Sequence, residues 1–191
     1  MREDGRVPRY VALLRGINLG GHNKVAMADL REVVTSLGHS EVTTYIQSGN
    51  VVFSSGQTST STLAADLERS IDKALDVKPR VVVLSRDELA AVIDANPYPD
   101  EPNPKAVHAI FLTGASESNM ADRIAELERR AAQKGGRDRV RLIGRTLYLH
   151  TPDGFGRSEL AALLLRNGKS IGASATARNW ATVTKLLELC G

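Results

Sequence analysis

The order of the apolar segments between residues 10 and 84 is the feature that most constrains how this chain can fold. Short runs rich in β-branched residues alternate with two longer stretches whose apolar residues recur every three or four positions, as on one buried face of a helix. The pattern predicts strand, helix, strand, strand, helix and strand at residues 10–14, 27–37, 43–47, 51–53, 63–75 and 80–84. This succession favours a ferredoxin-like unit, in which both helices pack on one face of an antiparallel four-stranded sheet.

A proline-rich stretch at residues 96–104 separates this unit from the rest of the chain. Four of its nine residues are prolines, which lack the backbone N–H that regular structure requires. We therefore expect an α+β protein with a ferredoxin-like subdomain at 1–95, a linker at 96–104, and a smaller α+β subdomain at 105–191 that packs on the first.

The second half of the chain also mixes helical and strand patterns. We expect a short helix at 87–94, a strand at 107–112, a helix at 117–134, a hairpin of 140–143 with 147–150, and helices at 158–167 and 176–190. Ser158 and Thr176 stand where N-caps belong. We find no convincing sequence repeat between the two halves.

The composition is that of an ordinary globular protein, with 42% hydrophobic and 25% charged residues among 191. The longest apolar runs, such as 160–165, are far shorter than the roughly 20 residues of a membrane-spanning helix. Residues 1–6 are charged and show no apolar core of a secretory signal. These features predict a cytoplasmic protein with no membrane partner, and the single cysteine, Cys190, excludes an intramolecular disulfide.

A glycine-rich polar loop at residues 15–24 directly follows the first predicted strand. Glycines between a strand and a helix can aim backbone N–H groups at an anion. These glycines nevertheless match neither the phosphate-binding pattern that ends in Lys-Ser or Lys-Thr nor the Gly-x-Gly-x-x-Gly dinucleotide pattern. Two interpretations stay open, an anion-binding loop and a structural turn, and the candidate ligand residues are Arg15, Asn18, Gly20 and Gly21.

Two further polar segments offer groups to a ligand. Residues 43–50 carry Gln47, Ser48 and Asn50 close to a hairpin turn. In the ferredoxin-like order the first and third strands are adjacent, so these residues can approach the opening loop if the register allows it. Residues 176–185 carry Arg178 and Asn179 beside the single tryptophan. Both segments also have a structural interpretation. In it, the residues near 48–50 serve only to form the hairpin turn, and Asn179 is a structural residue beside a packed Trp180.

Catalytic and metal-binding patterns have little support in the sequence. No nucleophile motif or close carboxylate pair occurs, and the histidines show no metal-ligand spacing. We therefore predict no metal site, and the sequence names neither a cofactor nor a reaction. The four histidines are His22, His39, His108 and His150. His22 is the best acid–base candidate because it lies in the glycine-rich loop, although the favoured interpretation is that it faces solvent.

A basic run occupies residues 129–145. Seven basic residues accompany one acid, Asp138: they are Arg129, Arg130, Lys134, Arg137, Arg139, Arg141 and Arg145. Such a run attracts phosphate, so a nucleic-acid- or protein-binding module that uses this surface is an alternative function. A solvated helix end and hairpin would give the same pattern, and the strand at 50–53 lacks the RNA-recognition signature.

Three segments of the chain together resemble a known family. Residues 13–21, 44–53 and 176–180, with the sequences LLRGINLGG, TYIQSGNVVF and TARNW, are similar to the uncharacterised bacterial proteins of domain-of-unknown-function family 1697. The resemblance implies a single compact protein of this size, with a ferredoxin-like N-terminal part and an α+β C-terminal part. It brings no established activity, cofactor or catalytic residue.

The occurrence of all three polar segments in one family favours a joint site. We expect a small anionic ligand, a nucleotide or a phosphorylated metabolite, to bind in a polar pocket between the subdomains. The residues expected to bind it are Arg15, Asn18, Gly20, Gly21, Gln47, Ser48, Asn50, Arg178 and Asn179. One alternative is a nucleic-acid- or protein-binding module that uses the basic surface at 129–145. The other is that the motifs are purely structural and hold the two subdomains together. No oligomeric state is predicted.

Overall fold

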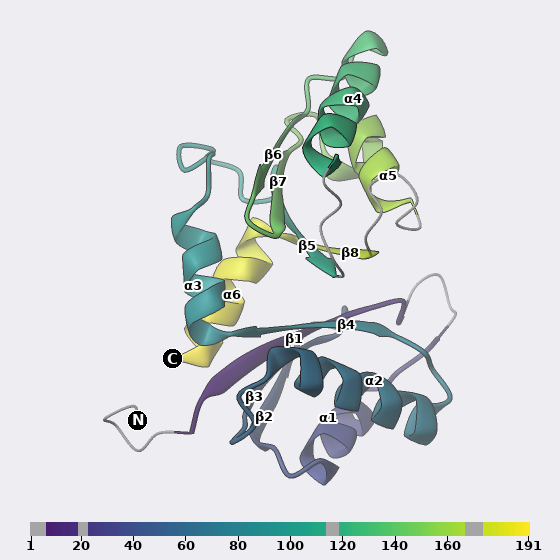
Figure 1. Ribbon diagram of the computed structural model, residues 1–191, viewed down its shortest axis with the longest axis vertical. Helices are drawn as coiled ribbons and strands as arrows, with labels where there is room; N and C mark the ends of the chain where they lie inside the picture. Colours follow the sequence, from purple (N-terminus) through teal and green to yellow (C-terminus); the bar gives the residue numbers. More distant parts are fainter. Residues whose placement is uncertain (1–6, 19–22, 114–118, 167–173) are drawn as a thin grey trace. The chain divides into compact units, whose positions relative to one another are not determined.

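The computed structural model describes residues 7–18, 23–113, 119–166 and 174–191 (Figure 1). The chain forms two compact units, the first made of Met1–Ala91 with Leu186–Gly191 and the second of Val92–Lys185. Two helices, α3 (Arg86–Asp94) and α6 (Trp180–Cys190), contribute residues to both units. Helices and strands occur in each, so the predicted α+β class is confirmed. Within the described ranges, no helix has the length and apolar character needed to cross a lipid bilayer.

The first unit contains the predicted succession of strand, helix, strand, strand, helix and strand. Its sheet has the strand order β2-β3-β1-β4, and every neighbouring pair is antiparallel. The first and third strands of the chain are therefore adjacent. The elements are β1 (Arg9–Arg15), α1 (Met27–Ser36), β2 (Ser40–Tyr45), β3 (Asn50–Ser54), α2 (Thr60–Leu75) and β4 (Arg80–Ser85).

Side chains alternate along β1 between the two faces of the first sheet. Tyr10, Ala12 and Leu14 belong to the core cluster beneath α1 and α2, to which the helices contribute buried residues such as Leu30. Leu13 points to the opposite face, because successive residues of a strand do. We call the side of this sheet that faces away from α1 and α2 its second face.

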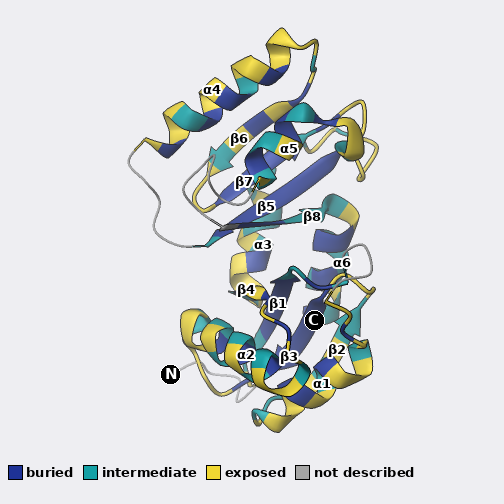
Figure 2. Cartoon of the chain, turned by 90° about the vertical axis from the view of Figure 1, so that its right-hand side faces the viewer, coloured by how far each residue is buried: buried dark blue, intermediate teal, exposed yellow. Residues whose placement is uncertain are grey.

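The second unit has the same order of elements. Its sheet order, β6-β7-β5-β8, places the four strands as in the first unit, again with antiparallel pairs. The core lies beneath α4 and α5, and Figure 2 shows buried positions alternating with exposed ones along α4. The elements are β5 (Val107–Thr113), α4 (Met120–Gln133), β6 (Arg139–Ile143), β7 (Thr146–His150), α5 (Glu159–Leu165) and β8 (Ser174–Asn179). The repeat is invisible in the sequence because a core needs apolar residues of fitting size rather than particular ones.

The predicted helix at 176–190 is wrong in its first four residues. Ser174–Asn179 is strand β8, which pairs with β5, and α6 begins at Trp180. Thr176 is therefore no N-cap; that position belongs to Asn179, whose Oδ1 accepts a hydrogen bond from Thr182 N at 2.9 Å. The run Ser-Ala-Thr-Ala-Arg has no strong preference of its own, so pairing with β5 decides its conformation. The Ser158 cap is confirmed, since its Oγ accepts a hydrogen bond from Ala161 N at 2.8 Å.

Two arginines hold the end of α6 within the first unit. Arg9 Nη2 donates to Leu189 O at 3.0 Å, and Arg86 Nε donates to Gly191 O. Positive charge at a helix C-terminus is favourable because the unpaired carbonyl groups there carry partial negative charge. Cys190 is buried between these contacts, and burial raises the pKa of its thiol. This cysteine is therefore a packing residue.

A helix carboxylate covers a backbone N–H at one edge of each sheet. In the first sheet, Glu68 of α2 accepts a hydrogen bond from Val81 N on β4 at 2.8 Å. In the second sheet, Glu128 of α4 accepts one from Val140 N on β6 at 3.1 Å. Because β4 and β6 are terminal strands of the two described sheets, no further strand among the described residues accepts from these N–H groups.

Candidate functional site

The side chain of Asn18 closes the loop that follows β1. Its Oδ1 accepts a hydrogen bond from Val25 N at 2.8 Å, and its Nδ2 donates to Val25 O at 3.0 Å. The backbone N–H of Asn18 donates to Asn23 O at 3.0 Å. Asn18 has a φ of 53°, a left-handed conformation that asparagine tolerates better than most residues. Backbone and side chain of Asn18 are therefore both bonded to residues 23 and 25.

The same side chain joins the loop to the turn between β2 and β3. Asn18 Nδ2 also donates to Gln47 O at 3.0 Å, and Leu14 N donates to Gly49 O at 2.8 Å. The first two predicted polar segments therefore meet within the first unit. Because both Nδ2 hydrogens bond to carbonyl groups of the protein, Asn18 acts to position the two segments.

Asn50 and Ser48 shape the turn from within. Asn50 is fully buried, and its Nδ2 donates to Tyr45 O at 3.0 Å and to Ser48 Oγ at 2.9 Å. Ile46 has a φ of 51°, which is rare for a β-branched residue, and is 52% exposed. Gln47 is exposed beside it. The turn thus presents Ile46 and Gln47 to solvent while Asn50 holds its backbone.

Replacing Asn18 with alanine is expected to lower the free energy of unfolding by about 2 kcal/mol, because three side-chain hydrogen bonds are lost. Asn23→Ala is the matched control. Asn23 has a similar φ of 51°, but its side chain makes one exposed hydrogen bond, to Gly16 O at 2.7 Å. Chemical denaturation followed by far-ultraviolet circular dichroism measures both variants. Equal losses would contradict the positioning role of Asn18.

Two arginines share the second face of the first sheet with Asn50. Arg15 lies opposite Arg80 in the register of β1 and β4. Leu13, on the same face as Arg15, lies opposite Asn50, and Asn50 in turn pairs with Tyr45. The Cβ atoms of Arg15, Arg80, Asn50 and Tyr45 therefore leave the sheet on one face, although the Arg80 guanidinium lies near Glu68 of α2. Like charges directly opposite each other on neighbouring strands are unfavourable, and a bound anion relieves that repulsion.

The third predicted segment belongs to the second unit. Arg178 lies on β8 opposite Ala109, and burial lowers the pKa of its guanidinium to about 10. Asn179 caps α6. Within the first unit Asn18 contacts Gln47 and Asn50 contacts Ser48, while Arg15 pairs in register with Arg80. Gly20, Gly21 and His22 lie outside the described residues.

Comparison with known proteins identifies the family. Residues 7–148 match the sequence model of a family described as Protein of unknown function (DUF1697). The chain belongs to this family. The matched range contains the first two polar segments and ends before the third.

Solved structures add information on the fold of this DUF1697 member. A conserved bacterial protein from Streptococcus pneumoniae is similar over 97% of this chain and 100% of its own, with 24% sequence identity and a TM-score of 0.72. That similarity shows a shared fold. An unknown protein from Galdieria sulphuraria is 10% identical over 96% of this chain and 88% of its own, and its TM-score of 0.26 is too low to bear on the fold. No curated protein matches the chain.

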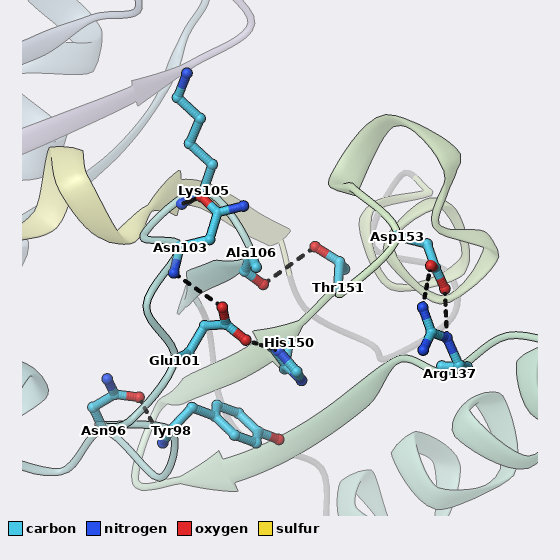
Figure 3. A network of polar contacts seen from close by, with 10 residues as sticks. All are labelled: Asn96, Tyr98, Glu101, Asn103, Lys105, Ala106, Arg137, His150, Thr151 and Asp153. Carbon is cyan, nitrogen blue, oxygen red and sulfur yellow. Dashed lines mark hydrogen bonds and ion pairs between the residues drawn. The ribbon is translucent and has the colours of Figure 1, made fainter.

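A polar network in the second unit of this DUF1697 protein connects residues that the sequence left apart (Figure 3). Glu101 Oε2 lies 2.6 Å from His150 Nε2, and Glu101 Oε1 accepts a hydrogen bond from Asn103 N at 3.0 Å. These two hydrogen bonds, that from Asn103 above all, hold the pKa of the Glu101 carboxyl below its usual range. The Tyr98 ring stacks on His150 with the ring centroids 5.2 Å apart. The network ties the proline-rich segment to β7.

Sequence reasoning missed this network because Glu101 and His150 are 49 residues apart. A local signal exists only for the turns. The side chains of Asn96 and Asn103 accept hydrogen bonds from the N–H groups two residues further on, those of Tyr98 and Lys105. Such short-range bonds are typical of asparagine in turns. They predict the bends of the segment but not the strand that it contacts.

Acids from outside the basic run at 129–145 neutralise much of its charge. Asp138, the acid within the run, is buried and accepts a hydrogen bond from Ser158 Oγ at 2.7 Å. Exposed ion pairs contribute little stability individually, but they reduce the local excess of positive charge. The ion pairs join Arg129 to Glu126, Lys134 to Glu159, Arg137 to Asp153 and Arg141 to Glu128.

Proposed function

We propose that this protein binds a small anionic ligand, such as a nucleotide or a phosphorylated metabolite, on the second face of its first sheet. The observation that carries the proposal is the cross-strand pair of Arg15 and Arg80. Guanidinium groups bind phosphate in a bidentate manner, and Arg15 and Arg80, as register partners, can both reach one phosphate group once the Arg80 side chain turns from Glu68 of α2 toward the second face.

The surroundings of Arg80 leave it able to take part. Its Nη1 lies 3.8 Å from Glu68 Oε2, at the limit of an ion pair, and the Arg80 side chain is 69% exposed. Exposed ion pairs of this kind are weak, so turning the guanidinium toward a ligand costs little. The Glu68 carboxylate keeps its hydrogen bond from Val81 N when Arg80 moves.

Asn18 and the turn at residues 45–50 support the proposal because their hydrogen bonds within the protein are in place before a ligand arrives. The side chains of Asn18 and Asn50 donate to backbone carbonyl groups. Groups that are already positioned lose less freedom on binding. Tyr45, on the same face, offers an aromatic ring to the base of a nucleotide, and Gln47 offers an exposed amide.

We prefer a small ligand to a nucleic acid because of the charge distribution. Four of the seven basic residues at 129–145 form ion pairs with acids, which weakens the surface that a polymer would need. Arg15 and Arg80, by contrast, are direct register partners on adjacent strands. A compact cationic group suits one or two phosphates rather than an extended backbone.

A thermal-shift screen of the full chain against nucleotides and phosphorylated metabolites tests this function. A ligand present at about 100 times its Kd stabilises the native state by about 2.7 kcal/mol. Arg15→Gln is expected to weaken such a ligand by about 10- to 100-fold, because a hydrogen bond to a charged group contributes about 1.5–3 kcal/mol. Arg80→Gln is expected to act in the same direction.

Arg69→Gln is the matched control for both variants. Arg69 is an exposed arginine of α2 that pairs with Asp66, and its replacement should leave the affinity unchanged. The proposal fails if no compound of these classes stabilises the wild-type protein. It also fails if a stabilising compound binds Arg15→Gln and Arg80→Gln as tightly as the wild type.

A further inference from the structure

His150 presents one ring nitrogen to the side of the second sheet that faces away from α4 and α5. Leu147 and Leu149, on the same strand, belong to the core cluster beneath those helices, so His150 points to the opposite side. Its Nε2 faces Glu101 at 2.6 Å. No hydrogen bond joins Nδ1 to any residue that the structure describes. With the Nε2 hydrogen directed at the carboxylate, Nδ1 becomes a donor when the ring takes up a second proton.

Glu101 fixes the orientation of this ring. Its carboxylate is itself held by Asn103 N at 3.0 Å, so the imidazole has a fixed partner (Figure 3). The side chains of His150 and Glu101 are 21% and 19% exposed, so the pair is sheltered but within reach of a small molecule from solvent. A carboxylate that orients a histidine in this way is a common feature of sites that bind or transfer protons.

Tyr98 adds a hydroxyl donor to the same place. Its ring stacks on the imidazole, and its hydroxyl oxygen is buried with no hydrogen-bond partner among the described residues. Burial raises the pKa of Tyr98; the guanidinium group of Arg141 opposes that rise, the carboxylate of Glu128 adds to it, and the guanidinium group of Arg139 opposes it. The hydroxyl therefore keeps its hydrogen at neutral pH. The described residues supply no acceptor for this donor, which leaves ordered water or a ligand oxygen to provide one.

Arg139 supplies positive charge beside His150. The two residues are partners in the register of β6 and β7, so their side chains leave the sheet on the same face, with Cβ atoms about 5 Å apart. Arg139 Nη1 donates to Asp138 O at 2.8 Å. Within the described part of the chain Arg139 forms no ion pair, whereas Arg141 has Glu128 at 3.9 Å. Arg139 thus keeps most of its donors for a ligand.

We propose that Tyr98, Arg139 and His150 form a binding site for one oxyanion group of a small molecule, and that His150 is protonated when the group binds. The hydroxyl, the guanidinium and the protonated imidazole are three donors that suit the oxygens of a phosphate or a carboxylate. Glu101 positions the imidazole. This site lies wholly within the second unit, and it does not depend on the ligand proposed for the first.

Nuclear magnetic resonance of the imidazole groups across a pH series tests the site in the full chain, with His150→Gln to assign the signal. Inorganic phosphate and acetate are the probes for the two kinds of oxyanion. At least one is expected to raise the pH at which His150 titrates by roughly half a unit or more, because a bound anion stabilises the protonated ring. The probe that gives the larger shift identifies the class of ligand.

Two variants decide whether the proposed donors are responsible. Tyr98→Phe removes the hydroxyl and keeps the stacked ring, and Arg139→Gln removes the charge; each should abolish most of the shift. Arg130→Gln, on α4 at the other side of the sheet, and Arg15→Gln, in the first unit, should retain it. Retention in Arg15→Gln separates this site from the one proposed above.

Three results would overturn the proposal. The first is an unchanged titration of His150 with both probes, which would make the Glu101–His150 pair a structural clasp for the proline-rich segment. The second is an equal shift with sodium chloride at matched ionic strength. The third is a full shift in both Tyr98→Phe and Arg139→Gln, which would place the anion elsewhere.

Discussion

Gly49→Ala is expected to lower the free energy of unfolding of the first unit by about 3 kcal/mol. A Cβ at this position would lie 2.8 Å from Ile17 Cδ1 and 2.8 Å from Leu14 Cβ, well inside van der Waals contact. Leu14 belongs to the central strand β1, so it cannot retreat without moving the sheet. Crowding of a packed core costs about 1–3 kcal/mol, and the φ of +74° costs a non-glycine residue about 1–2 kcal/mol more.

Gly16→Ala separates these two contributions. Gly16 has a φ of +88°, but a Cβ there would meet no atom within 4 Å. Its replacement is therefore expected to cost about 1–2 kcal/mol from backbone strain alone. Urea denaturation of both variants measures the difference. Losses of the same size would show that the contact of the turn with Leu14 and Ile17 is looser than the structure indicates.

The stability of the second unit is expected to fall as the pH decreases from about 6.5 toward 4. Burial lowers the pKa of His108 to about 4. The residue is 8% exposed and stacks on Phe155 with centroids 4.0 Å apart, and no described residue bonds its Nδ1. The unfolded chain takes up a proton near pH 6.5, whereas the folded chain does so only near pH 4. As the pH falls below 6.5, this difference lowers the free energy of unfolding by up to about 1.4 kcal/mol per pH unit, or about 3 kcal/mol in all. Above about pH 6.5 it has no effect on stability.

His108→Phe should flatten this dependence, because a phenyl ring of similar shape does not titrate. Fluorescence of Trp180, which packs near Tyr148 in the second unit, follows its unfolding at each pH. Both proteins carry the same carboxyl groups, Glu101 among them, so the difference between the two slopes isolates His108. An unchanged slope in the variant, or a His108 that titrates near pH 6.5 in the folded wild type, would contradict the assignment.

The elements of the first unit are predictable from sequence because each of its helices buries one face. Leu30 and Leu67 recur with their neighbours at helical spacing, and both are fully buried. Residues 176–179 are different, since alternating small and polar residues fit a helix or a strand, and only the presence of β5 beside them decides. The order of strands in the second sheet likewise depends on pairing between distant segments, which local patterns do not contain.

The candidate site was predictable only at the level of segments. Glycine content and polarity single out residues 15–24 and 43–50, and the two do meet, through Asn18 and Gln47. The role of each atom depends on register, so the use of both Asn18 Nδ2 hydrogens within the protein emerges only from the structure. Glu101 and His150 lie still further from prediction, because neither belongs to a recognisable motif and the fold alone brings them together.

The carboxylates of Glu68 and Glu128 affect how this chain behaves in a crowded solution. A chain with two sheets has twice as many exposed edges as a chain with one, and each edge can recruit a strand from another molecule. At β4 and at β6 an outward N–H already donates to a carboxylate. A carbonyl oxygen of an approaching strand would have to displace the carboxylate from this N–H group. It would then lie beside a negatively charged group, which is unfavourable. In each unit, one edge strand therefore carries an N–H group that is already bonded within the chain and is less open to a strand of another molecule.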